Sequence, residues 1–290
     1  MACKVCKVLT VMNMKGGVGK TTISTHLSSI VAHHSINERV KKVLVIDYDP
    51  QFNLSQAFLS VEKYRETEEN NRNVLSVLVE NQVVEDPFIL QKPDSLEPPK
   101  VKDVVVSLFE EDDRVFDLLP STLELMYLAL GRSGLALTAM EKRFAKFMEE
   151  AKEIYDLIVI DCHPAGSLFT KTALSASDHV LVPITPHNYA LRGVGLMYNF
   201  LKSPTFKRNK PQLHILFNHM PKSDDFIEQQ IRANERFGGK CLTSTMKKYS
   251  AYNDLVNGSG YVWQLNKAYS RMAYFNMRNI AVELLDKIYS

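Results

Sequence analysis

A stretch of ten residues near the N-terminus has the composition of a phosphate-binding loop. Residues 13–22 read NMKGGVGKTT, with three glycines before a lysine and two threonines. Glycines let the backbone curl so that successive N–H groups point at one phosphate, and a helix beginning there adds its positive N-terminal end. Lys20 could then reach the β- and γ-phosphates of a nucleotide, and the Thr21 hydroxyl could bind Mg²⁺.

The loop departs from the usual Walker A pattern, G-x-x-x-x-G-K-[ST]. Met14 stands where that pattern has its first glycine, and an additional lysine, Lys15, precedes the paired glycines. A glycine turn with incidental lysines is the alternative, but an apolar run before the loop and a helical pattern after it favour phosphate binding. We expect these residues around the phosphates: Lys15, Gly16, Gly17, Val18, Gly19, Lys20, Thr21 and Thr22.

Three aspartates follow two other apolar runs of strand length. The run VLVI leads into Asp47 and, two residues later, Asp49, and the run LIVI leads into Asp161. In an open parallel sheet, ligands bind at the carboxyl ends of the strands. Asp47 and Asp161 could therefore hold Mg²⁺ through water, and Asp49 could orient an attacking water. Asp before Pro is also common in turns. His163, two residues after Asp161, is either a chemical group or, as is commoner at a strand end, a loop or packing residue.

Alternating strand and helix patterns must position these residues. We predict strands at 7–12, 43–46, 157–160, 180–182 and 213–217, and helices near 20–34, 121–153, 167–176, 188–202, 224–237 and 268–289. This order is typical of βαβ units and predicts an α/β fold with a doubly wound, mostly parallel sheet flanked by helices. Because the sequence has no internal repeat and no Gly/Ser linker, we expect a single domain over residues 1–290.

Composition excludes several classes of protein. Of the 290 residues, 45% are hydrophobic and 23% charged, which excludes disordered, collagen-like and disulfide-scaffold chains. Four cysteines and no secretory leader predict a cytoplasmic protein, and no apolar run is long enough to predict a transmembrane contact. The spacing of Cys3 and Cys6 could suit a metal or iron–sulfur site, with buried small side chains as the alternative.

The net charge of +2 is the sum of segments of opposite sign. Residues 61–125 carry seven basic and sixteen acidic side chains, and we expect an acidic peripheral insertion at about 61–114, with a helix near 73–81 and a hairpin. It is either a solvated surface or a docking face for a partner. The C-terminal third, 199–282, carries thirteen basic and five acidic residues, so it is either a solvated face or suited to nucleic acid.

These motifs together resemble the ParA/MinD group of ATPases with a deviant Walker A loop, and most closely its ParA-type partition proteins. The resemblance rests on KGGVGKTT at 15–22, DYDPQ at 47–51, LIVIDC at 157–162 and Asn218 at the end of ILFN. NLS at 53–55 and LLPS at 118–121 add to it. It covers most of the chain, and leaves 61–114 and the last third only loosely matched.

The resemblance implies an ATP-dependent homodimer that hydrolyses ATP slowly, uses Mg²⁺ and binds DNA without sequence preference, in plasmid or chromosome partition and on the nucleoid. Lys15 would contact the phosphates of the partner subunit, as an arginine finger does, and Asn218 would meet the adenine. The activating partner would be ParB-like, with a basic segment that the acidic insertion could receive. The candidate DNA contacts are Lys202, Lys207, Arg208, Lys210, Lys247, Lys248, Arg271 and Arg278.

Two departures and one alternative accompany this resemblance. His163 stands where the family usually has proline, and the 61–114 segment is longer than expected. The alternative is a MinD-like ATPase that positions a protein or membrane cargo without DNA. A membrane-binding terminal helix would be basic and amphipathic, whereas the last residues also contain Glu283 and Asp286, as expected for a helix packed on its own domain.

Overall fold

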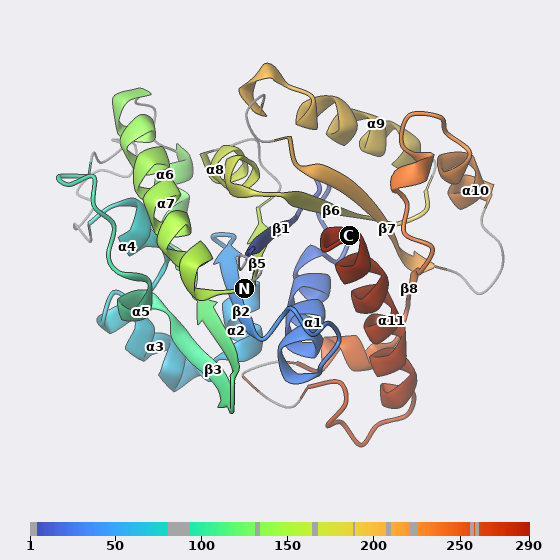
Figure 1. Cartoon of the computed structure of the whole chain (residues 1–290), viewed down its shortest axis with the longest axis horizontal. Helices are drawn as coiled ribbons and strands as arrows, with labels where there is room; N and C mark the ends of the chain where they lie inside the picture. Colours follow the sequence, from blue (N-terminus) through green and yellow to red (C-terminus); the bar gives the residue numbers. More distant parts are fainter. Residues whose placement is uncertain are drawn as a thin grey trace.

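A twisted, mostly parallel sheet forms the centre of the protein (Figure 1). The computed structural model describes residues 5–80, 93–130, 134–163, 168–187, 189–206, 210–220, 226–255, 258 and 261–290. Within these residues the strand order is β3-β4-β2-β5-β1-β6-β7-β8, and only β3 runs antiparallel to its neighbour. The strands are β1 (Lys7–Val11), β2 (Lys42–Tyr48), β3 (Val106–Glu111), β4 (Arg114–Leu119), β5 (Leu157–Cys162), β6 (His179–Ile184), β7 (Gln212–Met220) and β8 (Met246–Lys247).

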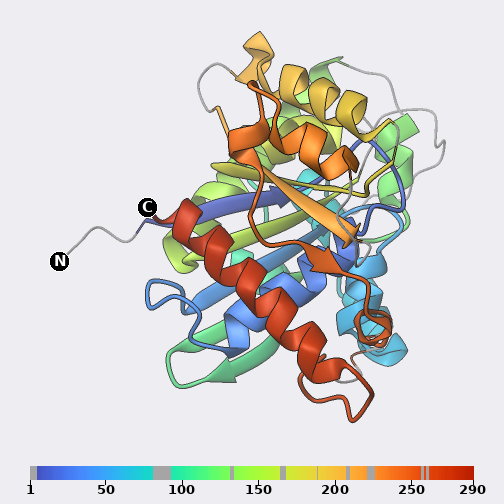
Figure 2. The same cartoon turned by 90° about the vertical axis from the view of Figure 1, so that its right-hand side faces the viewer.

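Helices cover both faces of the sheet. α1, α2 and α11 contribute to the core on one face, and α4, α7, α8 and α9 contribute to the core on the other. Figure 2 shows α11 lying alongside α1. The helices are α1 (Lys20–His33), α2 (Asn53–Phe58), α3 (Val61–Glu69), α4 (Val74–Leu78), α5 (Val101–Val104), α6 (Leu125–Leu130), α7 (Gly134–Ile154), α8 (Leu168–Ala176), α9 (Ala190–Leu201), α10 (Phe226–Arg232) and α11 (Ser270–Ile288).

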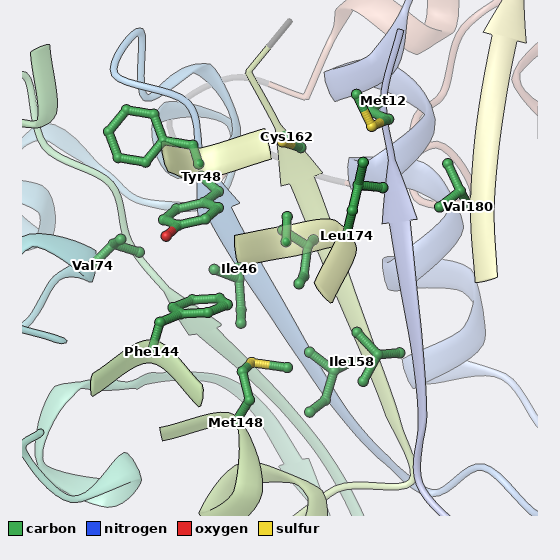
Figure 3. Packing of buried hydrophobic residues seen from close by; sticks show 14 of the residues in the cluster. Met12, Ile46, Tyr48, Val74, Phe144, Met148, Ile158, Cys162, Leu174 and Val180 are labelled. Atoms are coloured by element: carbon green, nitrogen blue, oxygen red, sulfur yellow. The ribbon is translucent and has the colours of Figure 1, made fainter. Parts of the chain in front are cut away.

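The central strands are apolar on both sides because both faces are covered. In β5, Ile158 and Ile160 enter one core, and Leu157 and Val159 enter the other, as the period of two in a strand requires. Figure 3 shows the core that contains Ile158 and Ile160. In it, the ring of Tyr48 stacks on Phe144 with centroids 4.9 Å apart. Burial on both faces explains why the sequences of these strands are continuous apolar runs.

The predicted fold class is confirmed, and the five predicted strands correspond to β1, β2, β5, β6 and β7. Two predictions differ from the structure. The helix expected over 121–153 is two helices, α6 and α7, and the parallel pairing of β4 with β2 was not predicted. Asp117 interrupts the apolar pattern of β4, but its carboxylate accepts a hydrogen bond of 2.6 Å from the Tyr155 hydroxyl inside the fold.

The described parts of the segment expected to be a peripheral insertion, 61–114, are only partly peripheral. The side chains of α3 are mostly exposed, whereas α4 and α5 contribute Val74, Val77, Val101 and Val104 to the core. The hairpin expected here is formed by β3 and β4 and extends to Leu119. None of the described helices combines the length and apolar character needed to cross a membrane.

Candidate nucleotide-binding site

The glycine loop connects β1 to α1 at the carboxyl edge of the sheet. Gly17 and Gly19 have φ of 71° and 83°, in the left-handed region that side chains disfavour. A Cβ at Gly19 would also lie 2.3 Å from Nδ2 of Asn218, so a larger residue would collide there. Gly19 is the N-cap of α1 and has no side chain to cap its first N–H groups. Those donors are thus available to an anion.

Lys20 and Asn13 fix the two ends of this loop. The Nζ of Lys20 lies 3.4 Å from the Lys15 carbonyl oxygen and is directed back across the loop, and the Lys20 side chain is buried. Nδ2 of Asn13 donates to the Pro183 carbonyl at 2.8 Å, and Oδ1 of Asn13 accepts from the Lys15 N–H. The loop is therefore held against β6 before any ligand binds.

Asn218 supports the loop from the end of β7. Its Nδ2 donates to the Val18 carbonyl at 2.8 Å, its Oδ1 accepts from the His219 N–H, and the residue is fully buried. The predicted contact of Asn218 with an adenine base therefore remains a prediction. What the structure adds is a bracing role, which the sequence did not indicate.

Asp161 lies at the end of β5 with one oxygen available. Its Oδ1 accepts a hydrogen bond of 3.0 Å from the Ser24 hydroxyl, whereas its buried Oδ2 has no hydrogen-bond partner among the described residues. Burial raises the pKa of Asp161 to about 6, and the hydroxyls of Thr21 and Ser24 oppose the rise. A buried carboxylate oxygen beside the threonine of a phosphate loop suits Mg²⁺ or one of its water ligands.

Asp47 is adjacent to Asp161 because β2 and β5 pair in register at these two residues. Its Oδ2 accepts from the N–H and the hydroxyl of Ser55, at 2.8 Å and 2.7 Å. Burial, followed by the charge of Asp161, raises the pKa of Asp47 to about 8, while the Ser55 bonds oppose the rise. Asp47 is thus already engaged in holding the start of α2, and its contact with Mg²⁺ through water remains a prediction.

Asp49 lies on the turn after β2, nearer to solvent than Asp47. Its Oδ1 accepts from the Gln51 N–H at 2.9 Å and lies 3.9 Å from Nε2 of His163. The backbone N–H of His163 also bonds to the Tyr48 carbonyl. His163 therefore packs beside Asp49. The sequence indicated no partner for His163, either as a chemical group or as a packing residue.

Lys15 is exposed and lies beside a cavity of about 420 Å³. Its Nζ is 2.8 Å from Nε2 of His187, a residue that sequence reasoning did not single out because it belongs to no motif. The cavity is lined by Asn13, Met14, Lys15, Val18, Ile184, Thr185, His187, Tyr189, Ala190, Arg192, Gly193 and Leu196. It extends the phosphate loop toward α9.

The candidate DNA-binding residues that the structure describes lie on several elements. Lys247 and Lys248 are exposed on and after β8, where the Lys247 N–H bonds to Asn276 of α11. On α11, the Arg271 guanidinium lies 5.7 Å from the centre of the exposed Phe275 ring, while Arg278 is half-buried. Lys202 lies over the Tyr198 ring of α9, Lys210 is exposed before β7, and Lys207 and Arg208 fall outside the described residues.

Cysteines give little support for a metal site. Cys3 falls outside the described residues, Cys6 is half-buried, and Cys162 and Cys241 are buried. Within the described ranges, no group of three or more His, Cys, Asp or Glu side chains is arranged to hold a metal ion.

Comparison with known proteins identifies the family of this chain. The profile of the AAA domain family AAA_31 matches residues 6–215. The sporulation initiation inhibitor protein Soj of Bacillus subtilis is 32% identical over 197 residues, which are 68% of this chain and 65% of Soj. A putative plasmid partition protein from Borrelia burgdorferi, bound to AMPPNP, aligns with a TM-score of 0.69 and 22% identity, covering 98% of this chain and 100% of that one.

A second solved structure, pNOB8 ParA bound to nonspecific DNA, aligns with a TM-score of 0.60 and 18% identity over 98% of this chain and 99% of that one. At such identities the structures establish the common fold. The family profile, by contrast, covers the phosphate loop, all three aspartates and the strands that carry them. The chain therefore belongs to the AAA domain family and, by its deviant Walker A loop and its similarity to Soj, to the ParA-type group within it.

Proposed function

We propose that the protein is an ATP-driven switch that dimerises around ATP, binds DNA without sequence preference and releases it after hydrolysis, in plasmid or chromosome partition. One observation carries this proposal. The phosphate loop lies next to Asp161, whose buried Oδ2 has no hydrogen-bond partner among the described residues. Membership of the AAA domain family supports the nucleotide, and the name of the putative plasmid partition protein from Borrelia burgdorferi supports the partition role.

In this proposal the loop residues hold the triphosphate of the substrate. The N–H groups of 16–22 and the ammonium of Lys20 bind the β- and γ-phosphates, because a helix N-terminus and a lysine both favour anions. Asp49 orients the attacking water. Its carboxylate suits this task because it is nearer to solvent than Asp47 and lies beside the Gln51 N–H and His163 at the mouth of the site.

Magnesium fits the residues present. The Thr21 hydroxyl would hold it, with Asp161 Oδ2 and Asp47 contributing through water, and the ion would neutralise phosphate charge. Hard oxygen donors are the ligands that Mg²⁺ prefers.

A second copy of the chain fits the surface around Lys15. The residues Met14, Tyr189 and Leu196 are exposed at the cavity rim, and Tyr189 is 74% exposed. Exposed apolar side chains beside a catalytic loop suit a surface covered in another state. Lys15, itself exposed, could then reach the phosphates bound by the partner and stabilise charge on the γ-phosphate.

DNA binding is proposed for the basic residues of the C-terminal third. Lys247, Lys248 and Arg271 are exposed, and counterion release rewards each phosphate they contact. Dimerisation would link two weak sites and so multiply affinity. The structure of pNOB8 ParA with nonspecific DNA supports the same proposal, and it would place the protein on the nucleoid.

A ParB-like partner with a basic activating segment would complete the cycle. The exposed carboxylates of α3, Glu62, Glu66, Glu68 and Glu69, offer it a complementary surface. The MinD-like alternative gains no support from α11, because Ile280, Leu284, Leu285 and Ile288 of that helix are buried in the core rather than available to a membrane.

The test uses the Asp49→Ala variant, which should bind ATP without hydrolysing it. Fluorescence anisotropy with two unrelated DNA duplexes should show binding with ATP and Mg²⁺, little binding with ADP, and equal affinity for both sequences. Affinity should fall steeply with salt. Binding that ignores the nucleotide, or no DNA binding by a variant that holds ATP, would contradict the proposal. Flotation with anionic vesicles in the same conditions would reveal the membrane alternative.

A further inference from the structure

Two buried serines connect the end of β4 to the turn that carries Asp49. The Ser121 hydroxyl donates to the Asp49 carbonyl at 2.7 Å, and the Ser121 N–H donates to the Ser55 hydroxyl at 2.9 Å. The Ser55 hydroxyl in turn donates to Oδ2 of Asp47. Both serines are fully buried. The backbone of Asp49 and the carboxylate of Asp47 are therefore held by one hydrogen-bonded chain.

The turn held in this way contains a residue in an unfavourable conformation. Phe52 has φ of 42° and ψ of 29°, in the left-handed region, although it is neither glycine nor asparagine. Its N–H donates to the same Asp49 carbonyl that Ser121 contacts, at 2.9 Å. Such a conformation persists only where the surroundings hold it in place, and it is common at functional loops.

Tyr64 of α3 closes a ring of contacts around this turn. Its aromatic ring stacks on Phe52, with centroids 5.0 Å apart and planes inclined by 13°. Its hydroxyl donates to the Ser121 carbonyl at 3.2 Å. The contacts thus run from Asp49 to Ser121, from Ser121 to Tyr64, and from Tyr64 through Phe52 back to Asp49. The same helix, α3, exposes acidic side chains on its outer face.

We propose that Ser121 and Tyr64 are positioning residues for Asp49. They fix the turn from which the Asp49 carboxylate projects, and Tyr64 links that turn to α3. The proposal rests on the proposed function, in which Asp49 orients the attacking water. Among the described residues, neither Ser121 nor Tyr64 forms a hydrogen bond with the phosphate loop. The affinity for nucleotide should therefore be largely independent of both residues.

The test compares variants that each remove one hydroxyl. Ser121→Ala and Tyr64→Phe remove the two positioning bonds, while Ser76→Ala removes a buried serine hydroxyl of α4 that bonds to the Asn71 carbonyl, away from the turn. We expect kcat for ATP to fall roughly 3- to 10-fold in the first two, as for one neutral hydrogen bond, with KM changed less than about twofold. Ser76→Ala should keep the wild-type kcat. Ser121→Thr, which retains a hydroxyl, should recover part of the loss.

A second measurement separates this proposal from the proposed function. Hydrogen–deuterium exchange of the amides at 51–55 should be faster in Ser121→Ala and Tyr64→Phe than in wild type and Ser76→Ala, whether or not ATP is hydrolysed. If wild type binds ATP but shows no hydrolysis, the proposed function fails and the exchange result alone decides whether the turn is held as described. The proposal would be overturned if Ser121→Ala and Tyr64→Phe both kept the kcat and the exchange rates of wild type. An equal loss of kcat in Ser76→Ala would overturn it as well. If Ser121→Ala does not fold, Tyr64→Phe, which keeps the stacked ring, decides.

Discussion

The ammonium of Lys15 lies 2.8 Å from Nε2 of His187, and the other ring nitrogen of His187 accepts from the Tyr189 N–H at 3.1 Å. Both nitrogens of the ring thus face N–H donors, although a neutral imidazole can accept only one hydrogen bond. The contact holds Lys15 weakly on its own subunit. We infer that Lys15 can leave it at little cost when a partner's phosphates approach.

This relationship predicts a change in the titration of His187. Burial, followed by the charge of Lys15, lowers the pKa of His187. In Lys15→Met the charge is gone, so the pKa should rise toward the ordinary value while remaining below it. NMR titration of the ring Cε1–H signal measures it, with Lys41→Met as a distant control. An unchanged pKa in Lys15→Met would show that the two side chains do not meet in solution.

Arg143 of α7 should be a major contributor to stability. It is 1% exposed and donates to the carbonyls of Ser76, Val77, Ser95 and Glu97 as well as to the carboxylate of Glu80. Arg143→Met leaves these acceptors without their donor, so we expect the free energy of unfolding to fall by about 3 kcal/mol.

Urea denaturation measures this decrease. The control is Lys146→Met on the same helix, because Lys146 is exposed and forms its ion pair with the exposed Glu97, an interaction that contributes less than about 1 kcal/mol. Equal effects of the two substitutions would contradict the role assigned to Arg143.

The buried pair His179 and His214 predicts a pH-dependent decrease in stability. Their Nδ1 and Nε2 atoms are 3.0 Å apart, and burial, followed by the charges of His179, Lys287 and Lys240, lowers the pKa of His214 to about 4. Well above pH 6.5 the ring is neutral in both folded and unfolded chains. Between pH 6.5 and 4 only the unfolded chain binds the proton, so the folded state becomes less stable as the pH falls.

Comparison with His214→Gln isolates this contribution from the other titrating groups. The stability of wild type should fall relative to the variant by up to about 1.4 kcal/mol per pH unit between pH 6.5 and 4. Denaturation at pH 7.5, 6.5, 5.5 and 4.5 tests it. A constant difference between the two proteins over that range would mean that His214 is protonated equally in folded and unfolded chains.

Charge reversal on β8 should weaken DNA binding. Lys247→Glu/Lys248→Glu removes two exposed cations, so affinity in the ATP state should fall for every sequence, and the slope of log K against log salt should decrease by about 1 for each phosphate that is no longer neutralised. Lys63→Glu/Lys102→Glu makes the same change in net charge on exposed residues elsewhere and should bind nearly as wild type. Equal decreases in both double variants would assign the effect to net charge alone.

Much of the site could be predicted because the ends of buried strands can be recognised in the sequence. Asp47 and Asp161 each end an apolar run, and parallel pairing of β2 with β5 brings them into register. The phosphate loop is local in sequence, so its glycines and lysines identify it without knowledge of the fold. The same kind of apolar run predicted the strands β1, β2, β5, β6 and β7.

The parts that could not be predicted depend on contacts between distant residues. Ser121 and Ser55 are 66 residues apart, and a serine carries no pattern that announces a buried hydrogen bond. The parallel strand position of β4 was not predicted because Asp117 breaks its apolar run, and only the folded chain supplies the Tyr155 hydroxyl that bonds to it. His187 gave no signal for the same reason, since its significance lies entirely in the position of Lys15.

The central claim, that ATP joins two copies of the chain through Lys15, is tested most directly by sedimentation velocity in the Asp49→Ala background, where ATP persists. With ATP and Mg²⁺ the protein should sediment as a dimer, and with ADP as a monomer. Addition of Lys15→Ala should leave it monomeric with ATP although it still binds the nucleotide through Lys20. A monomer with bound ATP in the Asp49→Ala protein, or a dimer that forms equally well without Lys15, would contradict the claim.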